Sequence, residues 1–436
     1  MKTSTQSQDA GPLRIERLPI PAVVMQHVED SMQLRQLRSV LVAAPHVRML
    51  QLSRIDERIA AHLDGVAVAG KYGASLANHS REGAGASRLF VATVRAIEDR
   101  DADCLDNLLA IAEAVAASRA GFLCAFGWAA AADLQGITKG LLESASPWRR
   151  EVGLATCAMH GVDPGSMLAY AIRDSDPGLR ARALRGAGRA GRLDLLDACL
   201  ARLTGEDSHC AFEAACSALL LGDRTESLGA LETLAVRPDA GVPHALAALR
   251  LVVKAVSPKR AQAMLASLAK DPALIRTVIQ GIAVAGDPHY VPWLIVQMKD
   301  LMLTRLAGEA FSFITGLDLA QNDLERRPPE SVKFGPNDDP NDGNVAMDED
   351  DNLPWPDAEK IGAWWKSNSV RFTPGTRYFM GEVPGPATCF NVLKTGYQRQ
   401  RIAAAEYLTL LVPGTPLFNT AAPAWRQQRL LAKMVA

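Results

Sequence analysis

The chain has 436 residues, of which 48% are hydrophobic and 22% are charged. This is the composition of a folded globular protein, and the length suits two or more domains or one elongated array. The formal net charge of −1 argues against a general nucleic-acid coat, because such a protein needs a surplus of basic residues. Only a local basic patch is left open.

The cysteines and the apolar stretches indicate where the protein works. None of the seven cysteines forms a Cys-x-x-Cys pair, and several lie in apolar helical runs, so we expect buried free thiols in a reducing compartment. The first 21 residues lack the apolar core of a signal peptide. The longest apolar stretch, residues 121–134, is too short to span a bilayer. The sequence therefore predicts a cytoplasmic protein with no membrane partner.

Two regions precede the regular part of the chain. Residues 1–20 are predicted to be disordered or extended, and residues 21–103 to form an N-terminal helical cap. Val24, Val28, Leu34 and Leu37 lie at helical spacing, and Pro45 interrupts the pattern. The charges of residues 52–65 then fall three or four positions apart, as on a solvated helix face. Atypical helices ahead of a repeat array usually cap it.

Residues 104–319 are predicted to form a repeat array, which is most regular between residues 146 and 316. Six segments begin with a polar or proline cap and continue into an alanine-rich helix, at steps of 28 to 33 residues. These starts are Ser146, Asp176, Asp207, Pro238, Asp271 and Lys299. Glycines follow about fifteen residues after five of the six starts, at a spacing typical of helical hairpins. They are Gly161, Gly191, Gly222, Gly286 and Gly316, and the fourth unit has Ser257-Pro258 instead.

Each of the two recurring positions, the helix start and the glycine after it, has a physical reason. Asp, Ser or Pro at a helix start satisfies backbone donors or presets φ, and Gly after a helix end adopts the left-handed conformation at little cost. A single hairpin of this size cannot bury its apolar faces, so the units must stack. The period of about 30 residues matches short HEAT repeats better than the 34-residue tetratricopeptide pattern. The sequence predicts an all-α fold, a right-handed α-solenoid of short HEAT-like helical hairpins.

In such a stack we expect the second helix of each hairpin to line the concave face. These helices are predicted at residues 164–173, 193–203, 225–236, 258–270 and 289–299. They mix basic and acidic residues, which argues against nucleic acid as the ligand of this face. The basic residues are Arg173, Arg202, Lys259 and Lys299, and the acidic ones are Asp197, Glu226 and Glu232.

Residues 320–352 are predicted to be an acidic flexible loop, because residues 337–352 contain seven acidic residues and almost nothing apolar. Asp338, Asp342, Gly343 and Glu349 stand at EF-hand-like positions, but Pro340 replaces an oxygen ligand there. A solvated loop is therefore favoured over a metal site. Two roles stay open for it: binding a basic partner, or folding over the array's own arginines.

Residues 353–436 are predicted to form a C-terminal helical cap rich in tryptophan and arginine. Aromatic residues and arginine are the types that dominate binding hot spots. The candidate partner-binding residues are Trp355, Trp364, Trp365, Arg371, Arg377, Tyr378, Arg399, Arg401, Arg426 and Arg429. The alternative is structural: the tryptophans close the open end of the array, and the arginines pair with the acidic loop.

No catalytic constellation stands out elsewhere. The eight histidines are scattered, with no His-Glu-x-x-His and no Cys/His pair at zinc spacing. The loose glycine pair Gly186 and Gly188 follows no strand, so it is not a phosphate-binding loop. We therefore predict no catalytic residue, no metal and no cofactor.

Several segments together resemble a known family. They are residues 62–65 (His-Leu-Asp-Gly), 353–357 (Leu-Pro-Trp-Pro-Asp), the pair Trp364-Trp365, residues 398–401 (Gln-Arg-Gln-Arg), 416–420 (Pro-Leu-Phe-Asn-Thr) and 425–429 (Trp-Arg-Gln-Gln-Arg). This pattern is similar to a proteobacterial family of HEAT-repeat proteins, conserved hypothetical proteins often encoded in type VI secretion gene clusters. Ile55 stands where a leucine is usual. The resemblance implies a cytoplasmic adaptor, chaperone or immunity-type protein for a secreted effector or secretion component.

The leading functional hypothesis is thus a non-enzymatic protein-binding scaffold. The alternative is an enzyme on a HEAT scaffold, either lyase-like or DNA-glycosylase-like. A glycosylase needs a basic concave face with a catalytic carboxylate directed into it, and a lyase needs an apolar pocket with an exposed Cys or His.

Overall fold

The computed structural model describes residues 18–79, 85–205, 207–236, 244–330, 335, 343 and 348–434. All named elements in these ranges are helices, which confirms the predicted all-α class, and only isolated β-bridges join extended segments. No helix in the described ranges has the length and apolar character needed to cross a membrane.

The helices before residue 146 form two groups. The first group is α1 (Pro21–Leu41), α2 (Met49–Val68), α3 (Gly70–His79) and α4 (Ala86–Glu98). The second is α5 (Ala102–Ala114), the 3-10 helix η1 (Ala116–Ser118), α6 (Arg119–Trp128) and α7 (Ile137–Leu142). The groups meet where α4 packs on α5 and α6, so the N-terminal helices are continuous with the later ones.

From residue 146 onward the helices alternate between two series. The inner series is α8 (Pro147–His160), α10 (Pro177–Ala190), α12 (Ser208–Leu220), α14 (Ala245–Ala255), α16 (Ile275–Ala285) and α18 (Thr304–Thr315). The outer series is α9 (Ser166–Ala171), α11 (Leu196–Leu200), α13 (Glu226–Ala235), α15 (Pro258–Leu268) and α17 (Val291–Gln297). The 3-10 helices η2 (Leu193–Leu195), η3 (Pro272–Leu274) and η4 (Pro288–Tyr290) precede α11, α16 and α17.

The predicted caps explain these boundaries. Asp176 and Asp207 accept hydrogen bonds from the backbone N–H groups of Leu179 and Cys210, at 2.8 and 2.7 Å. Four of the predicted glycines adopt the left-handed conformation directly after a helix; these are Gly161, Gly191, Gly286 and Gly316. The predicted start at Pro238 lies outside the described residues.

The last predicted start is wrong by several residues. The sixth inner helix begins at Thr304 rather than beside Lys299, because Asp300 starts a turn. Its carboxylate accepts a hydrogen bond from the Met302 N–H at 2.8 Å, and the Thr304 hydroxyl donates to the Met298 carbonyl at 2.7 Å. These bonds make Asp300 the residue that shapes the turn before the helix.

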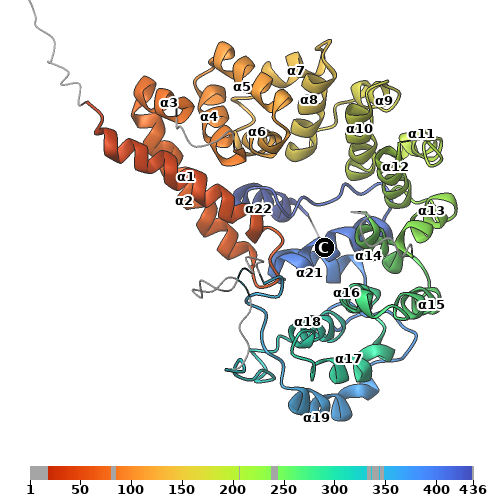
Figure 1. Cartoon of the computed structure of the whole chain (residues 1–436). Helices are drawn as coiled ribbons and strands as arrows, with labels where there is room; N and C mark the ends of the chain where they lie inside the picture. Colours follow the sequence, from red (N-terminus) through yellow and green to blue (C-terminus); the bar gives the residue numbers. More distant parts are fainter. Residues whose placement is uncertain are drawn as a thin grey trace, which may run out of the picture.

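The two series lie on opposite sides of an arc (Figure 1). Helix α8 packs on α10, α10 on α12, α14 on α16, and α16 on α18, while each outer helix packs against inner helices. The expectation that the second helices line the concave face is therefore wrong, because they form the outer series. Direct packing of the first helices on one another places those helices on the inside.

The C-terminal helices occupy the inside of this arc. They are α20 (Pro386–Thr395), α21 (Gln398–Leu411) and α22 (Ala424–Lys433), and they follow α19 (Ala358–Asn368) and η5 (Ser369–Arg371), which do not lie inside the arc. Helix α19 lies at the far end of the arc beside α17, whereas α21 packs on α12 and α14 (Figure 1). The chain thus turns back along its own inner face.

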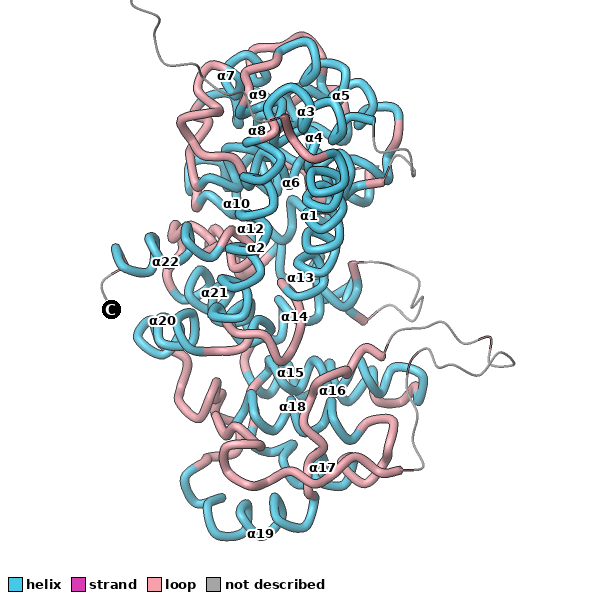
Figure 2. The backbone as a smooth tube through the Cα atoms, turned by 90° about the vertical axis from the view of Figure 1, so that its left-hand side faces the viewer, coloured by secondary structure: helices cyan, strands magenta, loops and turns pink. Residues whose placement is uncertain are grey.

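The N-terminal helices meet the C-terminal ones and close this arrangement. Helix α22 packs beside α2 (Figures 1 and 2). Asp56, which is fully buried, pairs with Arg38 at 2.5 Å and accepts a hydrogen bond from the Ala424 N–H at 2.6 Å. Arg38 also donates to the carbonyls of Ala421 and Ala422, at 3.1 and 3.0 Å. Removing either charge would leave the other buried beside unpaired backbone groups.

Candidate functional site

The three predicted tryptophans pack over α17 and α18. Trp364 lies 5.8 Å from the Phe311 ring centre and Trp365 lies 5.5 Å from that of Phe372. Trp355 is only 9% exposed, and the Arg305 guanidinium stands 5.0 Å above its ring. These positions are those of the structural alternative, in which tryptophans cover the end of the helix stack.

Arg377 and Tyr378 bind the ends of two inner helices. The Arg377 guanidinium donates to four carbonyls, those of Val253, Lys254, Val256 and Ala285, at 2.5 to 3.1 Å. The Tyr378 N–H donates to the Gly286 carbonyl at 2.8 Å. The last carbonyls of a helix have no partner within it, so these donors complete α14 and α16.

Arg401 is fully buried and has no carboxylate partner among the described residues. Its guanidinium donates to the side-chain oxygens of Gln398 and Gln427 and, at 2.8 Å, to the Leu393 carbonyl. Burial lowers the pKa of Arg401 to about 10. The two glutamines in turn donate to the carbonyls of Thr420, Val42 and Ala422. Arg401 therefore organises the junction of the two chain ends and is not presented to a partner.

The remaining predicted arginines divide into bound and exposed ones. Arg426 donates to the Gly127 carbonyl at 2.7 Å, at the end of α6, and Arg399 pairs with Glu309 at 2.8 Å. Arg371 and Arg429 are exposed. The ten predicted residues thus follow the inside of the arc from α18 to α6 and do not form one surface.

The described end of the acidic loop lies against arginines of the helix stack. Asp348 pairs with Arg305 at 2.7 Å, and Asp350 pairs with Arg276 at 2.8 Å. This corresponds to the second of the two predicted roles, in which the loop folds over the array's own arginines. The EF-hand-like residues Asp338 and Asp342 lie outside the described residues. Where the chain is described, no group of three or more His, Cys, Asp or Glu residues could hold a metal ion.

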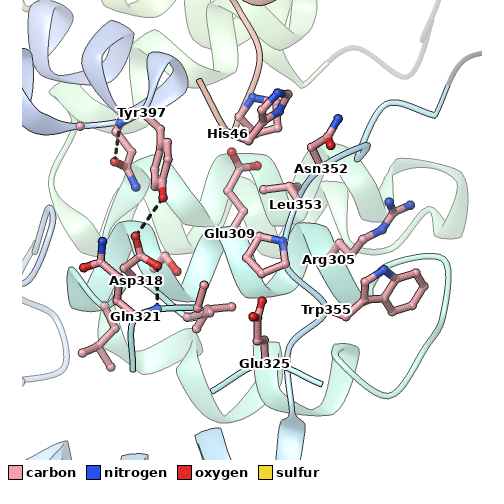
Figure 3. A pocket seen from close by; sticks show the side chains of 18 of the residues that line it. His46, Arg305, Glu309, Asp318, Gln321, Glu325, Asn352, Leu353, Trp355 and Tyr397 are labelled. Carbon is pink, nitrogen blue, oxygen red and sulfur yellow. Dashed lines mark hydrogen bonds between the residues drawn. The ribbon is translucent and has the colours of Figure 1, made fainter. Parts of the chain in front are cut away.

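A cleft of about 1000 Å³ opens beside this loop end (Figure 3). Its walls come from four parts of the chain, and the sequence analysis singled out only a few of the residues in them. These parts are the turn from Pro45 to Arg48, α18 with residues 316–328, residues 351–355, and residues 391–400; Met380 also lines the cleft. The cleft therefore exists only because the N-terminal hairpin, α18 and the C-terminal segment meet there.

One wall is fixed by Arg48, Asp318 and Tyr397. Asp318 accepts hydrogen bonds from the Arg48 guanidinium and the Tyr397 hydroxyl, both at 2.9 Å. The Arg48 guanidinium also stacks 4.4 Å from the Tyr397 ring centre. Burial, together with the hydrogen bond to Asp318, raises the pKa of Tyr397. The hydroxyl therefore stays protonated and holds the carboxylate in place.

Glu309 and His46 line the opposite part of the cleft (Figure 3). Burial raises the pKa of Glu309 even though Arg399 opposes it, and burial lowers the pKa of His46. The Nδ1 atom of His46 is buried and has no hydrogen-bond partner in the part of the chain that the structure describes. Both groups are thus held toward their neutral forms by removal from water.

The rim carries charged side chains that nothing else in the described chain uses. Glu325, Arg326 and Arg327 are exposed, and their side chains make no hydrogen bond with any described residue. Their backbone is nevertheless fixed, because the Arg326 N–H donates to the Trp355 carbonyl at 2.8 Å and Glu325 forms a β-bridge with Pro356. Free charges on a fixed backbone are suited to recognition, since little order is lost on binding.

Sequence reasoning missed most of this cleft. Arg48 and Asp318 are 270 positions apart, and no local pattern relates them. The sequence indicated Asp318 only as part of the turn after Gly316, and no sequence pattern pointed to Glu325. Trp355 was the one residue of the predicted site that signalled this region.

Comparison with known proteins identifies no relative, because no family model, no curated protein and no solved structure matches the chain. The assignment of the cleft therefore rests on its own geometry.

Proposed function

We propose that the protein is a non-enzymatic binding scaffold, a stack of HEAT-like helical hairpins that holds a protein partner in the cleft. The observation that carries this proposal is the set of three free charged side chains, Glu325, Arg326 and Arg327, on the fixed rim of an open cleft. They supply both signs of charge and can therefore pair with complementary charges of a polypeptide segment.

The HEAT-like character is supported by the repeated helix pairs. Helix α8 packs on α10, α10 on α12, α14 on α16 and α16 on α18, and a left-handed glycine ends four of the six inner helices. Such stacks present extended surfaces, because each unit contacts only its neighbours and the chain end is free to add walls. In this chain the added walls are the N-terminal hairpin and residues 391–400.

The state of the charged groups inside the cleft favours binding over acid–base chemistry. Asp318 is occupied by Arg48 and Tyr397, and Glu309 is occupied by Arg399. Both side chains are therefore engaged by donors of the protein itself, which fixes them in the wall of the cleft and leaves them less free to contact a substrate.

The resemblance of the sequence to HEAT-repeat proteins of secretion gene clusters leads us to propose a type VI secretion effector or secretion component as the partner. The protein would then act as an adaptor, a chaperone or an immunity-type binder in the cytoplasm. Each of these roles requires a stable complex between the scaffold and one folded or extended polypeptide.

The proposal is tested by purifying the tagged protein from its host and from a host carrying a rim variant. In the rim variant, Glu325→Gln, Arg326→Gln and Arg327→Gln are combined. We expect one stoichiometric protein partner with the wild type and its loss with the rim variant, at unchanged melting temperature. The matched control replaces three exposed residues of the outer surface, Arg173, Lys259 and Lys299, with Gln.

Two outcomes would overturn the proposal. The first is that no protein copurifies. The second is that the rim variant retains the partner as well as the outer-surface control does.

A further inference from the structure

A second feature lies on the inner series and α21. The side chains that point away from the packed cores there are mostly charged. On α10, Arg182, Arg185 and Arg189 follow each other at helical spacing, while Ala183, Leu184 and Ala187 are buried. On α21, Arg399 and Glu406 are two turns apart on the face that is not fully buried. We call these residues, together with their charged neighbours, the inner belt.

The inner belt consists of ten charged residues that act on one another in an unbroken series. They are Glu151, Arg182, Arg185, Arg189, Glu213, Arg250, Lys254, Glu309, Arg399 and Glu406. Its last members, Glu309 and Arg399, adjoin the cleft, because Glu309 lines it. The belt therefore leads from the cleft along the inside of α14, α12 and α10 toward α8.

Each of the four carboxylates in the belt is paired. Glu151 pairs with Arg182 at 3.1 Å, and Glu213 pairs with Arg185. Glu406 pairs with Lys254, and Glu309 with Arg399, both at 2.8 Å. Six cations and four carboxylates leave a difference of two positive charges.

The surplus belongs to Arg189 and Arg250. Neither guanidinium makes a hydrogen bond or an ion pair with any residue in the described ranges. The carboxylate of Glu406 acts on both arginines, but Lys254 already holds it. A guanidinium carries five N–H donors in a fork that matches an oxyanion. The guanidiniums of Arg189 and Arg250 are therefore both free to bind one.

Arg189 and Arg250 differ in their exposure to solvent. Arg189 is exposed to solvent, yet the surrounding protein lowers its pKa, and burial lowers that of the half-buried Arg250 as well.

We propose that Arg189 and Arg250 bind carboxylate side chains of an acidic segment of the protein partner, which runs from the cleft along the inner belt. This inference rests on the proposed function and names the chemistry of the partner. The four carboxylates in the belt disfavour a nucleic acid, because they repel its phosphates and leave too small a basic surplus. An acidic peptide can place its carboxylates on the two free guanidiniums and its neutral residues elsewhere.

The test uses the full-length protein and a fluorescein-labelled oligoglutamate peptide, with fluorescence anisotropy as the readout. We expect binding at low salt that weakens as salt is added. Arg189→Gln and Arg250→Gln should each weaken binding by about tenfold, the amount expected when one charge-assisted pair is lost. Arg173→Gln and Lys259→Gln remove the same charge from the outer surface and should leave the affinity unchanged.

Melting temperatures separate binding from folding. Because the guanidiniums of Arg189 and Arg250 make no hydrogen bond in the described chain, their replacement should leave the melting temperature unchanged or raise it. Equal affinity of the wild type and the double variant would overturn the inference. Competition by inorganic phosphate at the same concentration as the peptide would also overturn it, because the site would then be a small-anion site. If the rim variant loses its protein partner but no acidic peptide binds, this inference fails while the proposed function stands.

Discussion

The helices between residues 146 and 316 and the C-terminal residues 372–434 are stabilised in opposite ways. An inner helix is bounded by its own neighbours, as when Asp176 caps the Leu179 N–H three residues later. The C-terminal segment instead bonds residues more than a hundred positions away, as when Arg377 binds the Val253 carbonyl, 124 positions earlier. Local sequence therefore builds the stack, and the C-terminal segment completes it from the inside.

The same contrast applies to the glycines at the ends of the inner helices. Gly161, Gly191, Gly286 and Gly316 all have positive φ. A methyl group on Gly286 would lie 2.0 Å from the Tyr378 carbonyl oxygen, and one on Gly191 would lie 2.2 Å from that of Gly414, whereas nothing approaches Gly161. All these positions need glycine for its left-handed conformation. Gly191 and Gly286 also need it because the backbone of the C-terminal segment lies too close for a side chain.

The largest expected effect comes from Gly286→Ala. The left-handed conformation alone costs an alanine about 1 kcal/mol, and the clash with the Tyr378 backbone adds about 2 kcal/mol more. Gly161→Ala, which has only the first cost, is the matched control. Urea unfolding of both variants measures the difference. Equal destabilisation would show that the C-terminal segment does not lie against α16.

Arg401→Met is expected to lower the free energy of unfolding by about 3 kcal/mol. The replacement leaves the buried oxygens of Gln398 and Gln427 and the Leu393 carbonyl without their donor, at about 1 kcal/mol or more for each. The exposed Arg429→Met serves as control and should change stability by less than about 0.5 kcal/mol. An unchanged free energy of unfolding in Arg401→Met would contradict the role of this residue at the junction of the chain ends.

Arg377→Ala should cost about 2 kcal/mol, because it removes the donor that the last carbonyls of α14 and α16 share and water replaces only part of it. Arg377→Lys should recover little, since one ammonium cannot reach carbonyls on both helices. The exposed Arg371→Ala is the control. Hydrogen exchange of the last turns of α14 and α16 would localise the effect, and uniform exchange across the molecule would speak against it.

The smallest effect is a dependence of stability on pH that comes from His46. Its pKa in the folded protein lies below the ordinary value of 6.5, chiefly because of burial. The unfolded chain therefore binds the proton more readily, and the stability due to this residue is complete above pH 6.5. It is lost as the pH falls from there through the folded pKa. His46→Gln should flatten this part of the unfolding curve between neutral and acidic pH, and an unchanged slope would exclude His46 as its source.

How much was predictable depends on the range of the interactions. The helical class, the caps at Asp176 and Asp207 and the glycine ends arise from residues a few positions apart, so the sequence predicts them well. The turn at Asp300 was misassigned because a single aspartate can begin a turn or a helix, and the contacts of Thr304 and Met298 decide between the two. Which series faces inward was also misassigned, since both helices of a hairpin carry an apolar stripe and only their packing order decides.

The candidate site illustrates the other limit. The arginines of α10, spaced three and four residues apart, are a visible pattern, but whether each one has a partner depends on Glu151, Glu213 and Glu406, which come from three other helices. Similarly, the tryptophans and arginines of the C-terminal block were recognisable as unusual, whereas the backbone carbonyls and glutamine oxygens that Arg377, Arg401 and Arg426 bind were not.

The amino-acid sequence by itself determined that this protein is helical, where most of its inner helices begin and end, and that its C-terminal block differs from the rest. Caps and glycine ends act over one turn of helix, so they can be read from neighbouring residues. Only the tertiary structure decided that the C-terminal block lies inside the arc, that a cleft opens where both ends of the chain meet α18, and that Arg189 and Arg250 have no partner among the described residues. Those features depend on carbonyls and charges that folding brings together from distant positions, and no local pattern encodes them.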